Sequence, residues 1–454
     1  MSRFTLASLA ALAPAEAAAH AFGTRYDLPL PLGLWLAGAG LTVALSFVVF
    51  ALALRRGADG ASYPRFALLR VHPLAVKALG AVSVCVFFVL IAAGLFGTQD
   101  PFRNLAPAFV WIAWWIGFTY LSALVGDVWT VLSPWKALYP AGRSGLRREL
   151  PAAVGVWPAA ALLLAFGWIE IVWEGNAVPA NIALLALGYS VLTWSGMFVF
   201  GREAWLASGE VFAVYFHWLA KLAPGEVRAG KGAACEWRLR PPAAGLLDPR
   251  PVSSSEAFFV IVMLAAVTFD GLRETPLWAI GDSLWAAAAT AGLLATPCVF
   301  ALVILGACAL MARLTHGDAN RASAGELARL FVPTLLPIAL AYHVAHYLSY
   351  LLVAGQVVIP LASDPLGRGW DLFGTAHYEI AVGIVGARFA WYTSVIVIVI
   401  GHVLAMYVAH RRALGRFSER RSARRSQYPL AALMVGYTML SLWILAQPIV
   451  ETVE

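Results

Sequence analysis

Charged residues are scarce in this chain, and their scarcity indicates its class. Only 13% of the 454 residues are Asp, Glu, Lys or Arg, whereas 61% are hydrophobic. A soluble domain carries about 25% charged residues, so these few charges could not cover a water-facing surface of this size. Lipid must cover much of the surface instead, which predicts an integral membrane protein.

The motifs of several soluble enzyme classes are also missing. The four cysteines contain no CxxC pair, so no disulfide framework or thiol redox motif is predicted. There is no Walker A, GxSxG or HExxH motif, and no GxGxxG between a strand and a helix. The net charge of +7 comes from Lys and Arg in short loops, so it does not predict a nucleic-acid partner.

Long apolar runs make up most of the chain. A membrane-spanning helix needs about 20 mainly apolar residues, and ten stretches qualify. They cover residues 32–54, 75–97, 105–125, 152–173, 178–200, 256–275, 285–312, 329–353, 388–410 and 428–449. Because backbone polar groups in lipid must be satisfied internally, we predict an all-α, polytopic transmembrane helix bundle of about ten spans.

The loops between these spans predict the orientation of the bundle. The basic loops, which are retained in the cytoplasm, alternate with loops that carry few basic residues, and this pattern predicts that both termini lie outside. Residues 1–19 combine a weakly basic start, a short apolar stretch and Ala17–Ala19, which is typical of a cleaved signal peptide. An uncut, Ala-rich tail is the alternative. Residues 20–454 then form a single transmembrane helical domain.

Three cytoplasmic segments carry more specific expectations. The segment 203–222 mixes aromatic and charged residues, so we expect a helix that lies along the membrane surface. The Trp-rich segment 126–138 is typical of the membrane–water interface. The Pro-, Gly- and Arg-rich segment 223–255 is expected to be mostly irregular. We find no internal repeat of the kind that many transporters contain.

Three histidines within the spans are the sharpest chemical feature. His343 and His346 lie three residues apart in the eighth predicted span and share a helix face. His402 lies in the ninth, and a rise of about 1.5 Å per residue puts all three in the outer half of the bundle. Imidazole is a common ligand of zinc and copper, and ionisable groups within a membrane are usually functional. Hydrogen bonding between helices is the alternative role.

A fourth candidate ligand is His20. Cleavage after Ala19 would make it the first residue, and its amino and ring nitrogens would together form a chelate suited to copper. We therefore expect a transition metal, copper or zinc, bound by His20, His343, His346 and His402. Any of the polar residues near the outer face could supply a further ligand or a general base, although most are expected to be solvated loop charges, Arg partners or helix caps. They are Asp27, Asp100, Asp270, Glu274, Asp282, Asp364, Asp371, His377 and Glu379, with Glu170 in the fourth predicted span and Glu174 near its outer end. The sequence does not identify the catalytic residues.

Several segments resemble a known family. They are HAFGTRYDLPLPL at 20–32, GTQDPFRNLAP at 97–107 and ALAYHVAHYLSYLLVAGQVVIPLASDPLGRGWDLFGTA at 339–376. In these segments the chain resembles bacterial multi-pass membrane proteins, some of which are named fenitrothion hydrolase. The resemblance implies a bacterial inner-membrane hydrolase that cleaves the P–O–aryl bond of an organophosphate triester. It implies no particular catalytic residue.

Three classes of function stay open from the sequence. The first is an integral-membrane hydrolase that uses a histidine-bound metal. The second is a transporter of a small solute. The third is a metal-binding subunit or assembly factor, for copper or zinc, that works with another membrane subunit. The expected partners are membrane lipid and a small apolar substrate, with another membrane subunit required only by the third class.

Overall fold

The computed structural model describes residues 26–54, 63–139, 142, 145–146, 148–229, 235–248, 250–278, 284–319 and 322–451. Within these ranges, nine helical segments are long and apolar enough to cross a membrane. They are Leu32–Ala53 (α1), Pro73–Phe96 (α2), Leu105–Val125 (α3, η1 and α4), Pro179–Phe200 (α8), Ser254–Arg273 (α11), Trp285–Leu314 (α12), Ala324–Ser363 (α13 to α15), Ala387–Arg416 (α16) and Arg420–Ile449 (α17). The predicted all-α polytopic bundle is thus confirmed.

The remaining predicted span, 152–173, is shorter than expected. Its helix, α7, covers Trp157–Ile171, and 15 residues extend only about 22 Å. Gly155 interrupts the segment before it, because its backbone has a φ of +45° and a Cβ there would meet the Ser255 hydroxyl. Pro158 then occupies the first helical turn, where its fixed φ favours a helix start.

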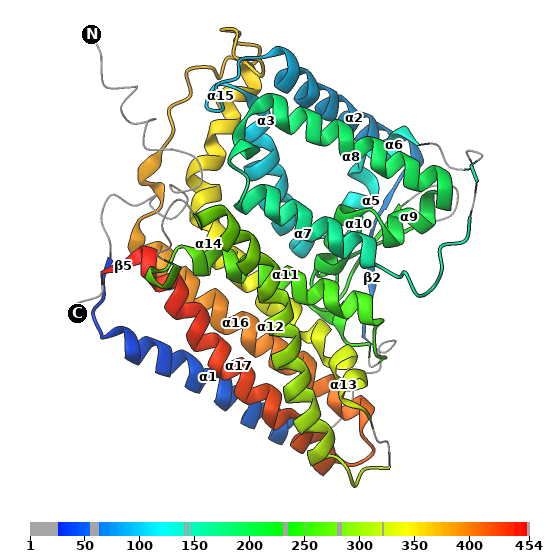
Figure 1. Ribbon diagram of the computed structural model, residues 1–454, viewed down its shortest axis with the longest axis vertical. Coiled ribbons are helices and arrows are strands. Elements are labelled where there is room, and N and C mark those ends of the chain that lie inside the picture. The colour runs from blue at the N-terminus through cyan, green and yellow to red at the C-terminus, as the bar shows by residue number, and fades with distance from the viewer. Residues whose placement is uncertain are drawn as a thin grey trace.

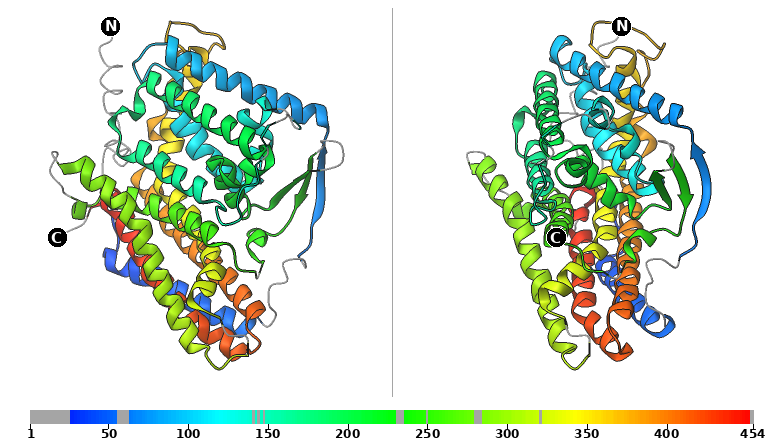
Figure 2. Two further views of the ribbon diagram at one scale, coloured as in Figure 1. Left: turned by 45° about the vertical axis from the view of Figure 1, so that its right-hand side comes forward. Right: turned by 90° about the vertical axis from the view of Figure 1, so that its right-hand side faces the viewer.

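The helices form two groups that are visible in Figures 1 and 2. One group contains α1, α12, α14 (Leu336–Ala354), α16 and α17. The other contains α2, α4 (Phe118–Val125), α7, α8 and α10 (Val211–Ala220). Helix α11 contacts both groups, and α14 contacts η1 of the second group. The interface between the groups therefore runs along α11 and α14.

The two ends of the helical region lie together. Strand β1 (Tyr26–Asp27) pairs in parallel with β5 (Val450–Glu451), next to the start of α1 and the end of α17. Such pairing requires an even number of membrane crossings. The nine long segments alone would give an odd number, and counting α7 as a further crossing makes the number even. The prediction that this end faces outward is not tested by this geometry.

The segment predicted to lie along the membrane surface is buried instead. Residues 203–222 form two helices, α9 (Arg202–Ser208) and α10, and eight of the ten residues of α10 are buried. The Trp-rich segment packs against α10 as α5 (Trp129–Leu132) and α6 (Pro134–Leu138). The burial of α10 contradicts the prediction of a helix that lies on the surface. Trp129 and Trp135 are also buried inside the protein, and the interfacial position of the Trp-rich segment stays a prediction.

Glu210 explains why α10 can begin inside the protein. Its carboxylate accepts hydrogen bonds from the backbone N–H groups of Phe212 and Ala213 at 3.1 and 2.7 Å, which caps the helix. It also accepts the Tyr189 hydroxyl at 2.5 Å and the Trp129 indole N–H at 3.2 Å. These four donors satisfy a carboxylate that has no exposed surface.

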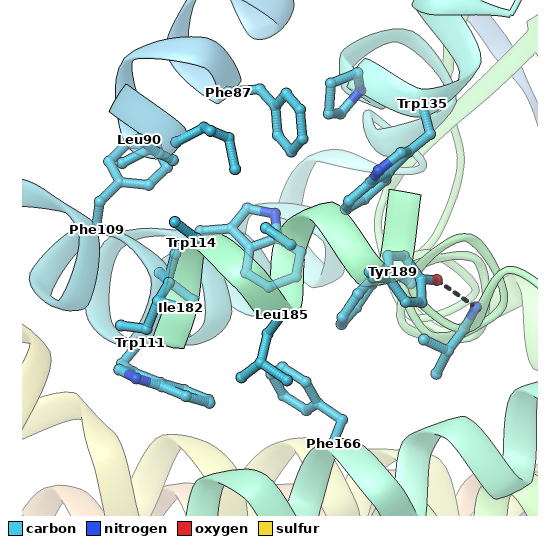
Figure 3. Close-up of a pocket in the computed structure, with 18 of the residues that line it drawn as sticks. Phe87, Leu90, Phe109, Trp111, Trp114, Trp135, Phe166, Ile182, Leu185 and Tyr189 are labelled. Carbon is cyan, nitrogen blue, oxygen red and sulfur yellow. Dashed lines mark hydrogen bonds between the residues drawn. The ribbon is translucent and has the colours of Figure 1, made fainter. Parts of the chain in front are cut away.

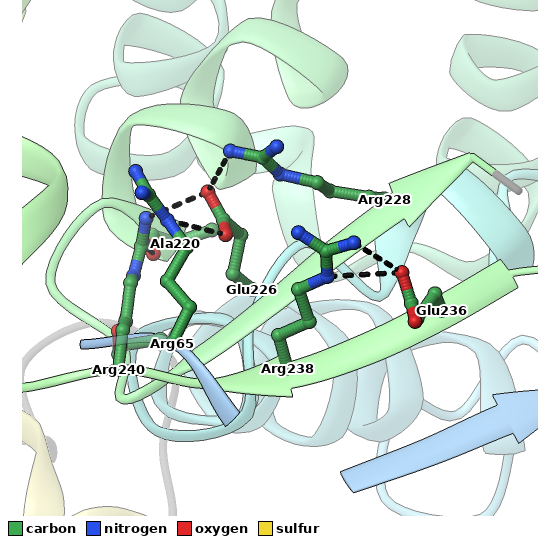
Figure 4. A network of polar contacts seen from close by, with 8 residues as sticks. Arg65, Ala220, Glu226, Arg228, Glu236, Arg238 and Arg240 are labelled. Carbon is green, nitrogen blue, oxygen red and sulfur yellow. Dashed lines mark hydrogen bonds and ion pairs between the residues drawn. The ribbon is translucent and has the colours of Figure 1, made fainter. Parts of the chain in front are cut away.

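The segment 223–255, expected to be mostly irregular, contributes to a small sheet. Strands β3 (Gly225–Ala229) and β4 (Cys235–Leu239) are antiparallel, and β2 (Phe66–Val71) pairs with the other edge of β4. Figure 4 shows the arginines of the sheet around two glutamates: Glu226 pairs with Arg65, Arg228 and Arg240, and Glu236 pairs with Arg238. Arg65, which precedes β2, and Arg240, which follows β4, thus connect these segments with Glu226 of β3.

Short elements complete the fold. The single-turn helices are η2 (Glu174–Ala177), η4 (Ala244–Leu246), η5 (Pro276–Trp278), η7 (Val332–Leu335), η8 (Gly355–Val357) and η9 (Val382–Ile384). The short α-helices not yet bounded are α3 (Leu105–Pro107), α13 (Ala324–Phe331) and α15 (Val358–Ser363).

Candidate functional site

A polar cluster lies at the interface between the two helix groups. Its centre is Asp270, near the C-terminal end of α11. The carboxylate accepts hydrogen bonds from Arg273 Nε at 2.9 Å, from His346 Nε2 at 3.1 Å and from the Tyr347 hydroxyl. Arg273 belongs to α11 itself, whereas His346 and Tyr347 come from α14. Asp270 therefore joins two membrane-crossing helices.

Burial gives this cluster its chemical interest. The Asp270 side chain is 7% exposed, the Arg273 side chain 12% and the His346 side chain 8%. A buried charge is tolerated when it is paired and hydrogen-bonded, and Asp270 and Arg273 satisfy that condition. Ionisable groups held inside a membrane bundle mark functional sites more often than structural ones.

His343 lies one helical turn before this cluster and is partnered differently. It is 5% exposed, and neither of its ring nitrogens has a hydrogen-bond partner among the described residues. Its ring packs against aromatic rings instead, with centroid distances of 4.7 Å to Tyr347 and 5.5 Å to Tyr120. A buried imidazole without a polar partner is costly, so His343 is available to a ligand or a water molecule.

A small cavity adjoins His343. Its volume is about 40 Å³, and its polar lining residues are Thr119, Glu170, Tyr215, Asp270, His343 and Tyr347. A cavity holds a water molecule when it offers about 10–15 Å³ and two to four polar partners. The cavity meets both conditions. Glu170 reaches it from α7, so carboxylates from two helices and an imidazole from a third share one water-sized space.

The helix η1 (Ala108–Gly117) contributes one residue, Trp115, to the lining of this cavity. It is a π-helix, a rare form that often occurs at functional sites. The neighbouring residues Trp114 and Trp115 lie in different spaces: Trp115 lines the small cavity, whereas Trp114 lines a larger cleft. The Trp115 ring contacts Phe166 of α7 at 4.6 Å and lies 6.5 Å from His343.

The larger cleft lies within the second helix group and has a volume of about 760 Å³. Residues of α2, η1, α7 and α8 line it, and Figure 3 shows Trp114, Phe166 and Leu185 around the same space. At one end the Tyr189 hydroxyl accepts a hydrogen bond from the Val211 N–H at 3.2 Å. The apolar cleft and the polar cavity thus adjoin at the contact between Phe166, which lines the cleft, and Trp115, which lines the cavity.

The sequence-predicted histidines have different environments. His346 bonds to Asp270, and the His343 ring packs against Tyr347. His402, in α16, donates a hydrogen bond from Nδ1–H to the Ile398 carbonyl at 2.9 Å, and its ring lies 5.8 Å from that of Tyr437. His20 lies outside the described residues.

No three His, Cys, Asp or Glu side chains in the described part of the chain are grouped so that they could hold a metal ion. Because His20 is outside that part, metal binding by His20, His343, His346 and His402 stays a prediction.

Sequence reasoning missed the partners of these histidines. Asp270 was one of several candidate carboxylates, but nothing in the sequence connected it with His346, 76 residues later. The available signal was the spacing of Asp270 and Arg273 on an otherwise apolar helix, since two charges three residues apart form an ion pair on one face. The aromatic wall of Trp115 and Phe166 had no sequence signal beyond a high aromatic content.

The fold and this site define a polytopic helical membrane protein with a buried acid–base cluster. Comparisons of the chain with family models, with curated proteins and with solved structures find no match.

Proposed function

We propose that this protein is an integral-membrane hydrolase of a neutral, lipid-soluble ester of the phosphotriester class. The observation that carries the proposal is the buried His343 ring, which lines a water-sized cavity with Glu170 and Asp270 and has no other polar partner in the described chain. The sequence resemblance to fenitrothion hydrolases supports the P–O–aryl bond as the one that is cleaved. A neutral triester dissolves in lipid, and we expect the bacterial inner membrane as the location.

In this proposal His343 is the general base. A water molecule in the cavity attacks phosphorus while the neutral imidazole accepts its proton. A new P–O bond forms, the P–O–aryl bond breaks, and the aryl oxide leaves with the electron pair. Transfer of the proton from His343 to the aryl oxide restores the base. The products are a phosphodiester and a phenol, and the Glu170 carboxylate orients the attacking water.

Asp270 acts as a positioning residue. It accepts a hydrogen bond from the hydroxyl of Tyr347, whose ring packs against His343, and its other contacts are with Arg273 and His346. These interactions keep the His343 ring in one orientation toward the water. Preorganised polar groups of this kind contribute much of the rate enhancement in enzyme sites.

The metal predicted from the sequence would activate the water by a different route. A zinc or copper ion on His20, His343, His346 and His402 would lower the pKa of its bound water and polarise the phosphoryl oxygen. His402 distinguishes the two routes, because it is a ligand in the metal route and has no role in the general-base route.

The test is turnover by the purified full-length protein in lipid vesicles. A neutral nitrophenyl phosphotriester is added, and released nitrophenolate is followed by its absorbance. We expect His343→Gln to lower kcat by about 100-fold or more, the usual contribution of a general base. His410→Gln is the matched control. His410 is a buried histidine near the C-terminal end of α16, and its Nδ1 lies 3.0 Å from Oε1 of Gln427.

Three outcomes would contradict this proposal. If vesicles with the wild-type protein release no more nitrophenolate than empty vesicles, the protein is not a hydrolase of this substrate. Turnover and bound metal that are lost together in both His343→Gln and His402→Gln would favour the metal route. A bound metal without turnover would favour the third class, a subunit or assembly factor.

A further inference from the structure

The lining of the larger cleft is unusually aromatic and carries no charge. Its 31 lining residues include five tryptophans, five phenylalanines and one tyrosine, and none is Asp, Glu, Lys, Arg or His. Aromatic residues make up only 12% of the whole chain. We propose that this cleft binds a neutral, lipid-soluble molecule that carries an aromatic ring and enters sideways from the bilayer.

The absence of charge from the lining decides the charge of the ligand. An ion in the cleft would lose its hydration without gaining a partner, which is strongly unfavourable, so the ligand is neutral. The volume of about 760 Å³ lies within the range of roughly 300–1,000 Å³ of sites for drug-sized molecules. The ligand is therefore a small molecule rather than a peptide or a whole lipid.

The arrangement of the rings favours an aromatic ligand over an acyl chain. Trp114 and Phe212 meet edge to face at 4.6 Å, and Phe166 and Phe212 at 5.2 Å. Rings fixed by their neighbours in this way offer faces and edges to a further ring. An aromatic pair is stabilised by the interaction between the two rings as well as by the apolar area it buries, whereas an acyl chain is stabilised by buried area alone.

Exposed residues at the rim indicate the route of entry. Val82 of α2 and Leu184 and Leu192 of α8 line the cleft and are 60%, 58% and 42% exposed. Helices α2 and α8 are both membrane spans. The surroundings of these side chains are therefore acyl chains, and a molecule dissolved in the bilayer reaches the cleft without crossing water.

The position of the cleft connects it with the proposed reaction. Phe166, which lines the cleft, contacts Trp115, which lines the cavity next to His343, with ring centroids 4.6 Å apart. This connection rests on the proposed function, in which the substrate is an aryl phosphotriester. The cleft would then bind the aryl group of that substrate. Binding itself does not depend on the hydrolysis.

Gly188 offers a direct way to block the cleft. It lines the cleft from α8, and a Cβ added there would meet no atom within 4 Å, so a phenyl group can occupy the open space without displacing the backbone. Gly306 of α12 is the matched control: a Cβ there also meets nothing within 4 Å, and it does not line the cleft. Both glycines lie inside membrane helices, so Gly188→Phe and Gly306→Phe are comparable substitutions.

The experiment measures quenching of tryptophan fluorescence by para-nitroanisole, a neutral nitroaromatic compound without a phosphoester bond. Full-length protein in lipid vesicles is titrated with this probe. We expect saturable quenching above the linear background from probe dissolved in lipid. Gly188→Phe should weaken the saturable component by about tenfold or more, and Gly306→Phe should leave it unchanged. An unhydrolysed nitrophenyl phosphotriester should compete with the probe.

Other results would overturn the inference. If quenching does not saturate, the probe does not bind in the cleft. The same conclusion follows if the saturable component of quenching is equal in Gly188→Phe and Gly306→Phe. A phospholipid with brominated acyl chains also quenches tryptophan fluorescence when its chains contact the rings. If the probe does not displace this phospholipid, the cleft binds lipid chains rather than an aromatic molecule. Saturable binding without any phosphotriester turnover would refute the proposed hydrolase and leave the aromatic site standing.

Discussion

Removing the Asp270 carboxylate should destabilise the bundle in a way that its partners predict. Asp270→Ala leaves the buried Arg273 guanidinium without its anion and leaves the Tyr347 hydroxyl without its acceptor. Breaking a buried ion pair from one side costs about 3–5 kcal/mol, and one lost hydrogen bond between membrane helices costs about 0.6 kcal/mol. We expect the free energy of unfolding to fall by roughly 4 kcal/mol.

A second substitution tests the cause of this loss. In Asp270→Ala/Arg273→Met the unpaired charge is gone and a side chain of similar length fills the space. Replacing both members of a buried pair by apolar groups is often neutral. The double variant should therefore be more stable than Asp270→Ala alone. Such recovery would show that the single variant fails because of a stranded charge rather than a missing side chain.

The assay is equilibrium unfolding in mixed micelles while a denaturing detergent is titrated. The 18 tryptophans report tertiary structure through their fluorescence, and far-UV circular dichroism reports the helices. An Asp270→Ala loss below about 1 kcal/mol would mean that water or lipid headgroups reach Arg273. A double variant less stable than Asp270→Ala would refute the stranded-charge argument.

Three further predictions concern other parts of the chain. Glu210→Ala should lower the free energy of unfolding by about 2 kcal/mol or more, measured in the same micelles, because it removes the cap of α10 and leaves buried donors unpaired; an unchanged value would contradict this. Reporter fusions after Arg250 and Arg425 should both report cytoplasm, and a non-cytoplasmic signal at both would reverse the predicted orientation. N-terminal sequencing of the mature protein should begin at His20, and a chain that begins at Met1 would remove the chelating amino terminus.

The predicted spans agree with the structure because their signal is local. A run of about 20 apolar residues in lipid must form a helix, whatever the rest of the chain does. The shortening of α7 has a local cause as well, in Gly155 and Pro158, but hydropathy averages over such residues. If the turn-forming residues Gly155 and Pro158 are considered together with hydropathy, the predicted helix begins later in the sequence.

The buried position of α10 was beyond the reach of composition. A helix that is rich in aromatic residues and has few charges is compatible both with a membrane surface and with a protein interior. The deciding contacts are those of Glu210 with Tyr189 and Trp129, which come from segments 21 and 81 residues away. The sheet was missed for a similar reason, since β2 pairs with a strand more than 160 residues later.

By itself the sequence determined that this is a polytopic helical membrane protein, because its hydrophobicity leaves no other stable arrangement in water or lipid. It also identified His343 and His346 as ionisable residues inside a span. Only the tertiary structure decided that His346 contacts Asp270, that His343 lines the neighbouring cavity, and that His402 has Tyr437 as its neighbour. Depth along a helix can be counted from the sequence, but the direction of a side chain depends on how neighbouring helices rotate and pack against one another.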